Sequence, residues 1–249
     1  MDSQLLKNRA IYVTKSGSHA YGLNVATSDL DIKGILVGYP ENYLGFLEKV
    51  EQLEEKEPND LVIYELQKFF RLTAQGNPNS IEVLFTDEKD IIFQNFMGKY
   101  IRENRQEFLS QSAKARFSGY AIAQLHRLRN SVNRNREIGE PGNWKNAMHL
   151  VRLLKMGIEI MTTGQVIVKR PDREELLAIR NGDWPYADLE KWALEQDKLL
   201  DKLYSEGKCP LPKTPNFKKL DKMCIELLQY VIKEDPKDLF YNKWNGKVN

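Results

Sequence analysis

The sequence predicts two structural regions, an N-terminal α/β module and a helical domain, with the boundary near residue 95. Three short segments before residue 65 are rich in β-branched, aromatic and aliphatic residues, which is typical of strands. Beyond about residue 90, long apolar patterns with helical spacing dominate instead. A chain of 249 residues is long enough for one large domain, or for two small ones that share an interface.

The N-terminal module is expected to contain strands over residues 10–15, 31–39 and 61–64. The first strand ends at the turn-forming cluster Ser16-Gly17-Ser18. A helix is expected over residues 65–74, because its apolar positions share one face, and another should begin near Ser80. The helical region is expected to hold the segments 117–136, 144–163, 188–206 and 216–234.

The composition is that of an ordinary soluble globular protein, with 41% hydrophobic and 29% charged residues. No apolar run approaches the roughly 20 residues that a membrane-spanning helix needs, and the N-terminus lacks the pattern of a secretory signal. Cys209 and Cys224 are the only cysteines. They can form neither a disulfide framework nor a Cys-based zinc site. We therefore expect a cytoplasmic protein that does not bind a membrane.

The net charge of +2 points to no particular partner, but the charge is unevenly distributed. Between Glu41 and Asp60, seven acidic residues stand against two lysines. Between Lys99 and Arg136, nine basic residues stand against two glutamates. This basic segment can form a binding surface for a polyanion, with Arg127, Arg134 and Arg136 as its candidate contacts. The alternative is a solvated helix face that is balanced by the acidic segment.

Two carboxylates stand close together at the start of the second expected strand. Asp29 and Asp31 are two residues apart, and side chains with this spacing on a strand point to the same face. Both can therefore bind one divalent cation. Mg²⁺ is commonly held by one or two carboxylates together with substrate phosphates, and phosphoryl transfer requires such an ion.

Gly17 and Ser18 lie at the end of the first strand, about ten residues before these carboxylates. A glycine lets backbone amides approach a phosphate without a Cβ atom in the way, and the serine hydroxyl adds a donor. A helix that begins near His19 adds a favourable dipole for an anion. Each feature alone is common in turns, but their combination in this order indicates a phosphate and metal site.

The same residues resemble the signature of the DNA polymerase beta-like nucleotidyltransferase superfamily. The resemblance is closer still to its bacterial and phage nucleotidyltransferases that are grouped under an RNA-repair pathway. That subgroup has a Gly-Ser-x-Ala-Tyr-Gly element, matched by residues 17–22, and a Ser-Asp-x-Asp-x-Lys-Gly element, matched by residues 28–34. Further matches, over most of the chain, are Lys68-Phe69, Gly76-Asn77-Pro78, Glu82, Met148-His149, Arg152, Pro171-Asp172-Arg173, Ile179-Arg180 and Leu211-Pro212.

The resemblance implies an α+β fold, with a small mixed-sheet nucleotidyltransferase domain over residues 1–95. An all-helical domain over residues 96–249 would close over the nucleotide and its acceptor. The implied reaction is the attack of an acceptor hydroxyl on the α-phosphorus of a nucleoside triphosphate such as ATP, which releases pyrophosphate. Gly17, Ser18 and Ser28 would hold the triphosphate, while Asp29 and Asp31 would hold Mg²⁺ or Mn²⁺.

The family also uses a third carboxylate on a neighbouring strand, which helps to bind the metal and to deprotonate the acceptor. Asp60 is the preferred candidate because it directly precedes the strand over residues 61–64. Glu65, at the other end of that strand, is the alternative. Their separation is odd, so only one of the two can share a face with the site on a regular strand.

Three further cationic or titratable residues are candidates for phosphate contacts. Lys33 follows Asp31 by two residues, so it either contacts a phosphate or pairs with a nearby aspartate. His149 and Arg152 are three apart on an expected helix and share its face with Lys145. The resemblance favours nucleotide binding by His149 and Arg152, and the alternative is a polar face packed against an acidic segment.

These observations predict a metal-dependent nucleotidyltransferase. The basic segment and the resemblance favour an RNA end as the acceptor, with tRNA among the candidates. Transfer to a protein hydroxyl is the alternative within enzymes. A non-catalytic nucleotide- or RNA-binding module is the alternative outside them, although the presence of both Asp29 and Asp31 argues against it.

Overall fold

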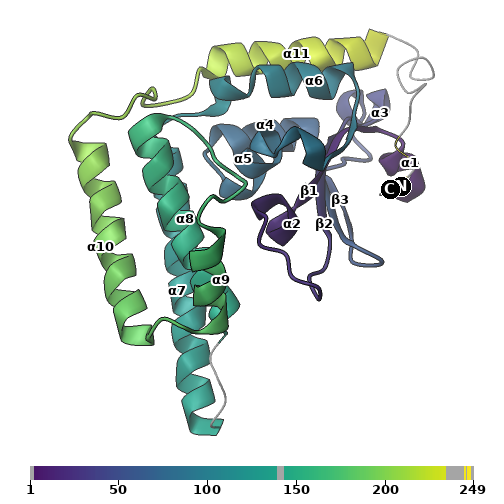
Figure 1. Cartoon of the computed structure of the whole chain (residues 1–249). Helices are drawn as coiled ribbons and strands as arrows, with labels where there is room; N and C mark the ends of the chain where they lie inside the picture. The colour runs from purple at the N-terminus through teal and green to yellow at the C-terminus, as the bar shows by residue number, and fades with distance from the viewer. Residues whose placement is uncertain (1–2, 139–142, 234–243, 245, 248–249) are drawn as a thin grey trace. The chain divides into compact units, whose positions relative to one another are not determined.

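The computed structural model describes all residues except 1–2, 139–142, 234–243, 245 and 248–249, and it does not describe the side chains of residues 5 and 135–138. Contacts between Cα atoms divide the chain into two compact units (Figure 1). The first unit contains residues 1–74, 79–108 and 215–249. The second contains residues 75–78 and 109–214.

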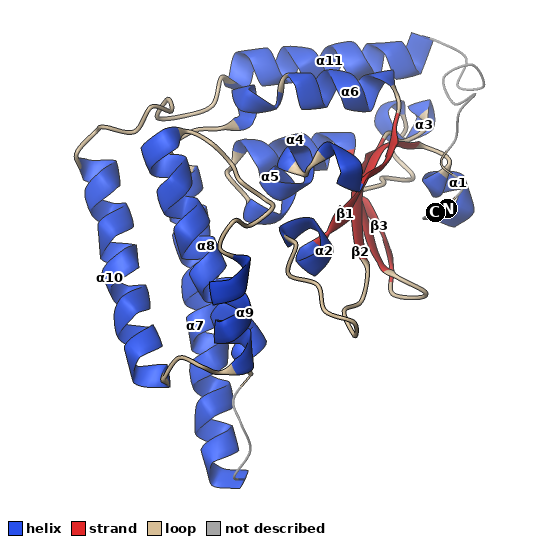
Figure 2. Ribbon diagram, viewed as in Figure 1, coloured by secondary structure: helices blue, strands red, loops and turns tan. Residues whose placement is uncertain are grey.

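The first unit is built on one mixed sheet of five strands (Figure 2). In chain order they are β1 (Ala10–Ser16), β2 (Asp31–Leu36), β3 (Gln52–Glu55), β4 (Asp60–Glu65) and β5 (Ile91–Gln94). Their order across the sheet is β3-β4-β2-β1-β5. Only the β2–β4 pair is parallel; the other three pairs are antiparallel. The prediction of an α+β fold with a mixed sheet and a helical C-terminal region is confirmed.

The two faces of this sheet are covered by two separate apolar clusters, which follow from the alternation of side chains along each strand. On one face, Ile35 packs with residues of the helices α4 (Leu66–Ala74), α5 (Pro78–Phe85), α6 (Phe96–Glu103) and α11 (Phe217–Lys233). On the other face, Ile32 and Leu36 pack with Leu6 of the helix α1 (Ser3–Lys7) and with Trp244. Both faces of β2 are therefore covered, and only Asp31 and Lys33 of this strand are half-buried.

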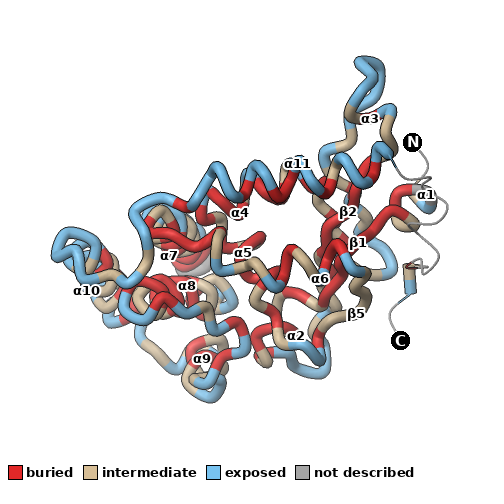
Figure 3. Tube along the Cα trace, turned by 90° about the horizontal axis from the view of Figure 1, so that it is seen from above, coloured by how far each residue is buried: buried red, intermediate tan, exposed pale blue. Residues whose placement is uncertain are grey.

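The helix α11 belongs to the first unit, although it is far from the sheet residues in sequence. Its buried side chains, among them Leu220, Leu227 and Val231, share a cluster with α4 and α6. Figure 3 shows α11 alternating between buried and exposed along its length, as one apolar face requires. The first compact unit thus takes in α6 and α11, which lie beyond the expected boundary at residue 95.

The second unit is helical. It contains α7 (Ala113–Ile138), α8 (Trp144–Thr163), α9 (Arg173–Asn181) and α10 (Tyr186–Ser205). The helix α8 contacts each of the other three, and its buried residues include Leu150, Leu154 and Ile160. Gly164 and Gly182, both in the left-handed conformation, end α8 and α9, and Gly207 adopts the same conformation in the turn after α10. Within the described ranges of both units, no helix combines the length and the hydropathy that crossing a membrane requires.

Candidate active site

One end of the sheet brings Ser16, Asp31 and Asp60 into a single row. In the β1–β2 ladder Ser16 is the Cα partner of Asp31, and in the parallel β2–β4 ladder Asp31 is the partner of Asp60. Residues opposite each other on neighbouring strands point to the same face. Adjacent strands lie about 4.8 Å apart, so two carboxylates are placed side by side at this end of the sheet.

The face that carries this row follows from the neighbours of Asp31 along β2. Ile32 belongs to the cluster packed with α1, and Ile35 belongs to the cluster packed with α4, α5, α6 and α11. Asp31, Lys33 and Ile35 alternate onto the same face. The row therefore lies on the face of the sheet that packs with α4, α5, α6 and α11, at the end where α2 (Gly17–Tyr21) follows β1.

Gly17 is packed directly against the Asp31 carboxylate. A Cβ atom built on Gly17 would overlap Asp31 Oδ2 and would lie 2.7 Å from its Cγ. Gly17 also has a φ of +57°, a conformation that side-chain-bearing residues rarely adopt. Both properties require a glycine here, and together they bring the backbone of the predicted phosphate turn next to the first carboxylate.

The short helix α2 is fixed at its C-terminal end. The Leu23 amide donates to the Ser18 carbonyl at 2.8 Å, and Gly22 adopts the left-handed conformation with a φ of 70°. The hydroxyl of the buried Tyr21 donates to Glu82 Oε2 of α5 at 2.5 Å. The orientation of Gly17 and Ser18 is thus coupled to α5.

Two other predicted residues have polar contacts in this region. The Lys33 ammonium donates to Asn79 Oδ1 of α5 at 3.1 Å, so at least one of its contacts is with an amide. The Ser28 hydroxyl accepts a hydrogen bond from the Val25 amide at 2.9 Å and so stabilises the loop before β2. In α2, His19 Nε2 is buried and has no hydrogen-bond partner among the described residues.

Asp29 lies on the loop before β2, not on the strand, because β2 begins at Asp31. Its side chain is exposed. The alternation rule that predicted a common face for Asp29 and Asp31 therefore does not apply, since it holds only within a regular strand. The direction in which the Asp29 side chain points therefore depends on the conformation of the loop over residues 24–30.

Asp60 and Glu65 have different surroundings. Asp60 is exposed and opposite Asp31, whereas Glu65 is buried and opposite Leu36 at the other end of β4. Glu65 accepts hydrogen bonds from the Tyr43 hydroxyl at 2.8 Å and from two backbone amides at the start of α4, those of Gln67 and Lys68. Burial raises the pKa of Glu65. Glu65 thus caps a helix far from the row.

The donor set of the row fits a divalent cation in part. Carboxylate oxygens are the ligands that Mg²⁺ prefers, and Asp31 and Asp60 supply two carboxylates on adjacent strands. Within the parts of the chain that the structure describes, no group of three or more His, Cys, Asp or Glu side chains is close enough to hold a metal ion. The row therefore offers a pair of carboxylates, a set that commonly binds Mg²⁺ together with substrate phosphates.

His149 and Arg152 belong to the second unit, on α8. Arg152 is buried, and its guanidinium contacts Met156 Sδ at 3.2 Å. Burial and the neighbouring charges of Arg152, Lys145 and Arg180 lower the pKa of His149 to about 3. His149 is consequently neutral at physiological pH. It can donate or accept a hydrogen bond to a phosphate, but it adds no positive charge to the three cations around it.

The basic segment is divided between the two units, and several of its members stabilise the fold. Buried Arg102 donates to the Tyr12 hydroxyl at 2.9 Å and to the Thr86 carbonyl at 2.7 Å. Lys114 and Arg129 form ion pairs with the α10 residues Asp201 and Glu190. Arg127 and Arg134 are exposed, and the Arg136 side chain is outside the described residues. The surface available to a polyanion is thus smaller than the sequence count suggests.

Two relatives resemble the chain over part or most of its length. An uncharacterized 38.9 kDa protein of Enterobacteria phage T4, from the nrdC-mobD intergenic region, is 29% identical over 121 residues. The match covers 43% of this chain and 35% of the phage protein, so the chain corresponds to about a third of that relative's length. A nucleotidyltransferase-like protein from Exiguobacterium sibiricum has a TM-score of 0.26 and 13% identity, with coverage of 93% of this chain and 70% of that one.

A family model matches the chain as well. Residues 3–226, which include the carboxylate row, the Gly17 turn and the helices α1 to α10, match the model of the RNA repair pathway DNA polymerase beta family. This match spans most of the chain, and it agrees with the resemblance carried by residues 17–34. The chain therefore belongs to the RNA repair pathway DNA polymerase beta family.

Proposed function

We propose that the protein transfers a nucleoside monophosphate from a nucleoside triphosphate to a hydroxyl group at an RNA end. The acceptor oxygen forms a bond to the α-phosphorus, the bond from that phosphorus to the bridging oxygen of the β-phosphate breaks, and pyrophosphate leaves. The observation that carries the proposal is the row of Ser16, Asp31 and Asp60, with Gly17 packed against the Asp31 carboxylate.

Each part of the row has a role in this reaction. The amides of Gly17 and Ser18 and the Ser18 hydroxyl bind the triphosphate, since no Cβ atom at Gly17 blocks the approach. The His19 imidazole, whose buried Nε2 has no hydrogen-bond partner among the described residues, supplies one more polar contact in the same turn. Asp60 accepts the proton of the attacking hydroxyl. Asp31 and Asp60 would hold the metal ion together with the substrate phosphates, and Asp29, on the preceding loop, is a further candidate ligand.

Asp31 and Asp60 would hold a divalent ion, which when bound would neutralise charge on the phosphates. Mg²⁺ and Mn²⁺ both suit oxygen ligands. Lys33 lies on the same face as Asp31 and adds positive charge there. Within the second unit, His149 and Arg152 are the proposed nucleotide contacts, and we assign the RNA end to the exposed arginines of α7, Arg127 and Arg134.

The test is transfer of label from each α-labelled nucleoside triphosphate, in the presence of Mg²⁺ or Mn²⁺, to a defined oligoribonucleotide or to total RNA including tRNA. Asp29→Asn and Asp31→Asn should abolish transfer while the protein stays folded, because metal binding needs the charged carboxylates. Asp221→Asn, an exposed aspartate on α11, is the matched control and should keep full activity.

The label itself distinguishes the acceptors. Label on RNA supports the proposal, and label on a polypeptide would assign a protein hydroxyl as the acceptor instead. Nucleotide binding without transfer to either, with every nucleotide and both metals, would identify a binding module. Normal turnover by Asp31→Asn would remove the carboxylate row from the active site.

A further inference from the structure

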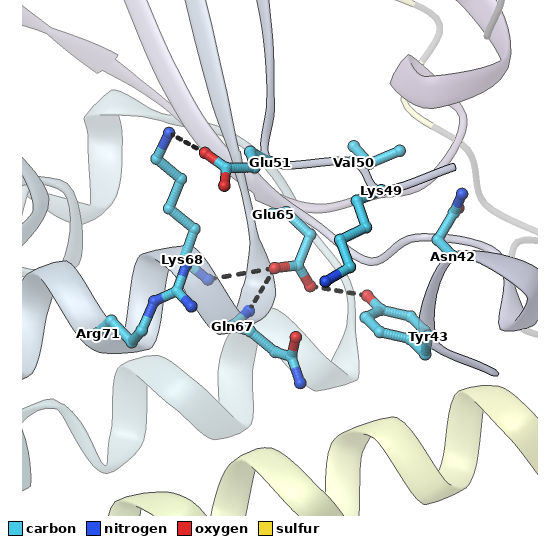
Figure 4. Close-up of a pocket in the computed structure, with 9 residues that line it drawn as sticks. All are labelled: Asn42, Tyr43, Lys49, Val50, Glu51, Glu65, Gln67, Lys68 and Arg71. Carbon is cyan, nitrogen blue, oxygen red and sulfur yellow. Dashed lines mark hydrogen bonds and ion pairs between the residues drawn. The ribbon is translucent and has the colours of Figure 1, made fainter. Parts of the chain in front are cut away.

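A polar pocket lies in the first unit, at the end of β4 that is remote from Asp60. It is a cavity of about 240 Å³ between the start of α4, the end of β4 and the segment before β3 (Figure 4). Charged groups dominate its lining: two carboxylates, Glu51 and Glu65, and the three cations Lys49, Lys68 and Arg71. Nothing in the nucleotidyl transfer reaction assigns a role to these residues.

The negative charge of Glu65 is already compensated within the protein. One of its oxygens accepts from the Gln67 amide at 2.8 Å and from the Lys68 amide at 3.1 Å, and the other accepts from the Tyr43 hydroxyl at 2.8 Å. The positive end of the α4 dipole adds to this stabilisation. Glu65 therefore forms the back wall of the pocket, and its negative charge is largely compensated without a cation.

The second carboxylate is compensated as well. Glu51 pairs with the Lys68 ammonium at 3.1 Å, and this contact lowers the pKa of Glu51, so it stays ionised. Lys49 and Arg71 are different. Neither has a carboxylate within the 4.0 Å ion-pair distance among the residues that the structure describes. Figure 4 draws them on either side of Glu65. Both act on Glu51 through longer-range charge interactions, and Arg71 also acts on Glu65, but neither cation is held in an ion pair, so each can still bind an external anion.

We propose that this pocket binds a phosphate group through Lys49 and Arg71, with the Gln67 side-chain amide as a third donor. A guanidinium binds two oxygens of a phosphate in parallel, and an ammonium adds a mobile point charge. One water takes about 30 Å³ of liquid volume, so the cavity has room for a phosphate and part of its attached sugar. The phosphate of a nucleic-acid strand and that of a free nucleotide share this chemistry.

The pocket is separate from the catalytic row. Asp60 and Glu65 are five residues apart on one strand, which corresponds to roughly 16 Å at about 3.3 Å per residue. A phosphate in the pocket is therefore not the one undergoing transfer. Because the inference uses no catalytic residue, it holds or fails independently of the proposed function.

The experiment measures binding of a labelled single-stranded oligoribonucleotide by fluorescence anisotropy as a function of salt, with the full chain. The double variant Lys49→Gln/Arg71→Gln should weaken binding and flatten the plot of log affinity against log salt by about 0.7, the value for one lost phosphate contact on a single strand. Lys56→Gln/Lys218→Gln removes two exposed lysines of the same unit and is the matched control, with an unchanged slope expected. Thermal unfolding of each variant establishes that it is folded.

A second arm titrates inorganic phosphate and a nucleoside monophosphate, with the unphosphorylated nucleoside as the negative ligand. Loss of phosphate and nucleotide binding in Lys49→Gln/Arg71→Gln, with an unaltered oligonucleotide slope, would identify free phosphates as the source. Arg71→Lys, which keeps the charge but loses the planar donor pair, should retain partial binding. If the double variant matches the parent in both arms, the pocket does not bind phosphate.

Discussion

Gly17 and Asp31 are in such close contact that the glycine leaves no room for a β-carbon beside the carboxylate. The two residues are fourteen positions apart in the chain, and the β1–β2 ladder brings them together because Ser16 pairs with Asp31. The proposed phosphate turn and the proposed metal ligand Asp31 are thus in direct contact. A change at Gly17 should act on both.

Gly17→Ala should reduce affinity for a nucleoside triphosphate at least tenfold, since the methyl group displaces the Asp31 carboxylate and the turn together. The positive φ adds a general cost of about 1–2 kcal/mol for a residue with a side chain. Gly207→Ala is the control, because Gly207 has a φ of +66° with nothing within 4 Å of the added Cβ atom. Calorimetric titration with a non-hydrolysable triphosphate and Mg²⁺ measures the affinity, and thermal melts measure stability. If Gly17→Ala and Gly207→Ala lose the same stability, and Gly17→Ala binds the nucleotide as tightly as the parent, the phosphate binds elsewhere.

Asp60→Ala should impair transfer and leave stability nearly unchanged, whereas Glu65→Ala should mainly lower stability. Asp60 is exposed and opposite Asp31, so its loss should abolish transfer and change stability by less than about 0.5 kcal/mol. Glu65 satisfies three buried or half-buried donors, so its loss should cost roughly 1–3 kcal/mol or more in the free energy of unfolding. Urea unfolding and single-turnover transfer under conditions where both variants are folded separate the two. Loss of transfer in Glu65→Ala alone would reverse the choice of the third carboxylate.

Much of this fold could be predicted from local sequence patterns. The strand at residues 10–15 and the helix at 144–163 carry clear periodicities, and the structure has them at nearly the same bounds. The edge strands β3 and β5 have four residues each and no alternating pattern of their own, so only their pairing reveals them. The packing of α11 in the first unit is equally non-local, because an apolar helix face does not indicate which surface it will cover.

The site shows the same limit. The spacing of Asp29 and Asp31 predicts two nearby carboxylates, but the start of a strand cannot be located to one residue, and Asp29 lies outside it. The choice between Asp60 and Glu65 as a neighbour of Asp31 needed the parallel register of β2 and β4, which no local pattern contains. The coupling of Tyr21 to Glu82 across α2 and α5 was not predicted either.

Tyr21→Phe should raise the KM for the nucleoside triphosphate several-fold while kcat changes less. The Tyr21 hydroxyl holds α2, and with it Gly17 and Ser18, through its 2.5 Å hydrogen bond to the buried Glu82. Loss of the donor should also cost about 1–3 kcal/mol of stability, since it removes a hydrogen bond from a buried carboxylate. Weaker ground-state binding appears in KM, as expected for a residue that positions the triphosphate turn.

Tyr100→Phe is the matched control for this change, because the Tyr100 hydroxyl also donates to a glutamate, Glu226, at 3.3 Å on an exposed surface. Its KM should equal that of the parent. Steady-state kinetics below the melting temperature of both variants decides the matter. A purely structural role for Tyr21 would lower the melting temperature and leave KM unchanged.

His149 should make the protein less stable in mild acid. Its pKa is about 3 in the folded protein because of burial and the nearby Arg152, Lys145 and Arg180, and about 6.5 in the unfolded chain. Between these values the unfolded chain binds more protons, so the free energy of unfolding falls as the pH decreases from about 6.5 towards 3. The slope contributed by one proton is at most about 1.4 kcal/mol per pH unit. His149→Gln should remove this component, and His126→Gln, at an exposed position on α7, should not. Urea unfolding of the three proteins at pH 7, 6, 5 and 4 gives the slopes; parallel curves for His149→Gln and the parent would show that His149 is not held neutral.

The basic segment provides the last prediction, which concerns the acceptor. If α7 binds RNA, replacing Arg127, Arg134 and Arg136 together by alanine should weaken RNA binding and leave triphosphate affinity unchanged. About four phosphate contacts give a slope of roughly −3 in a plot of log affinity against log salt, and loss of three contacts should flatten it by about 2. Replacing Lys191, Lys198 and Lys213, exposed lysines of the same unit, is the charge-matched control and should leave the slope unchanged.

Arg127 and Arg134 are exposed, whereas Arg102, Lys114 and Arg129 of the same segment already have partners within the protein. The prediction therefore depends on a small part of the positive charge that the sequence contains. A slope equal to that of the parent would mean that this helix face is only solvated. Combining the triple variant with Lys49→Gln/Arg71→Gln would then show whether the RNA contacts lie in the first unit. If they do, the combined variant should bind RNA with a flatter salt slope than the triple variant.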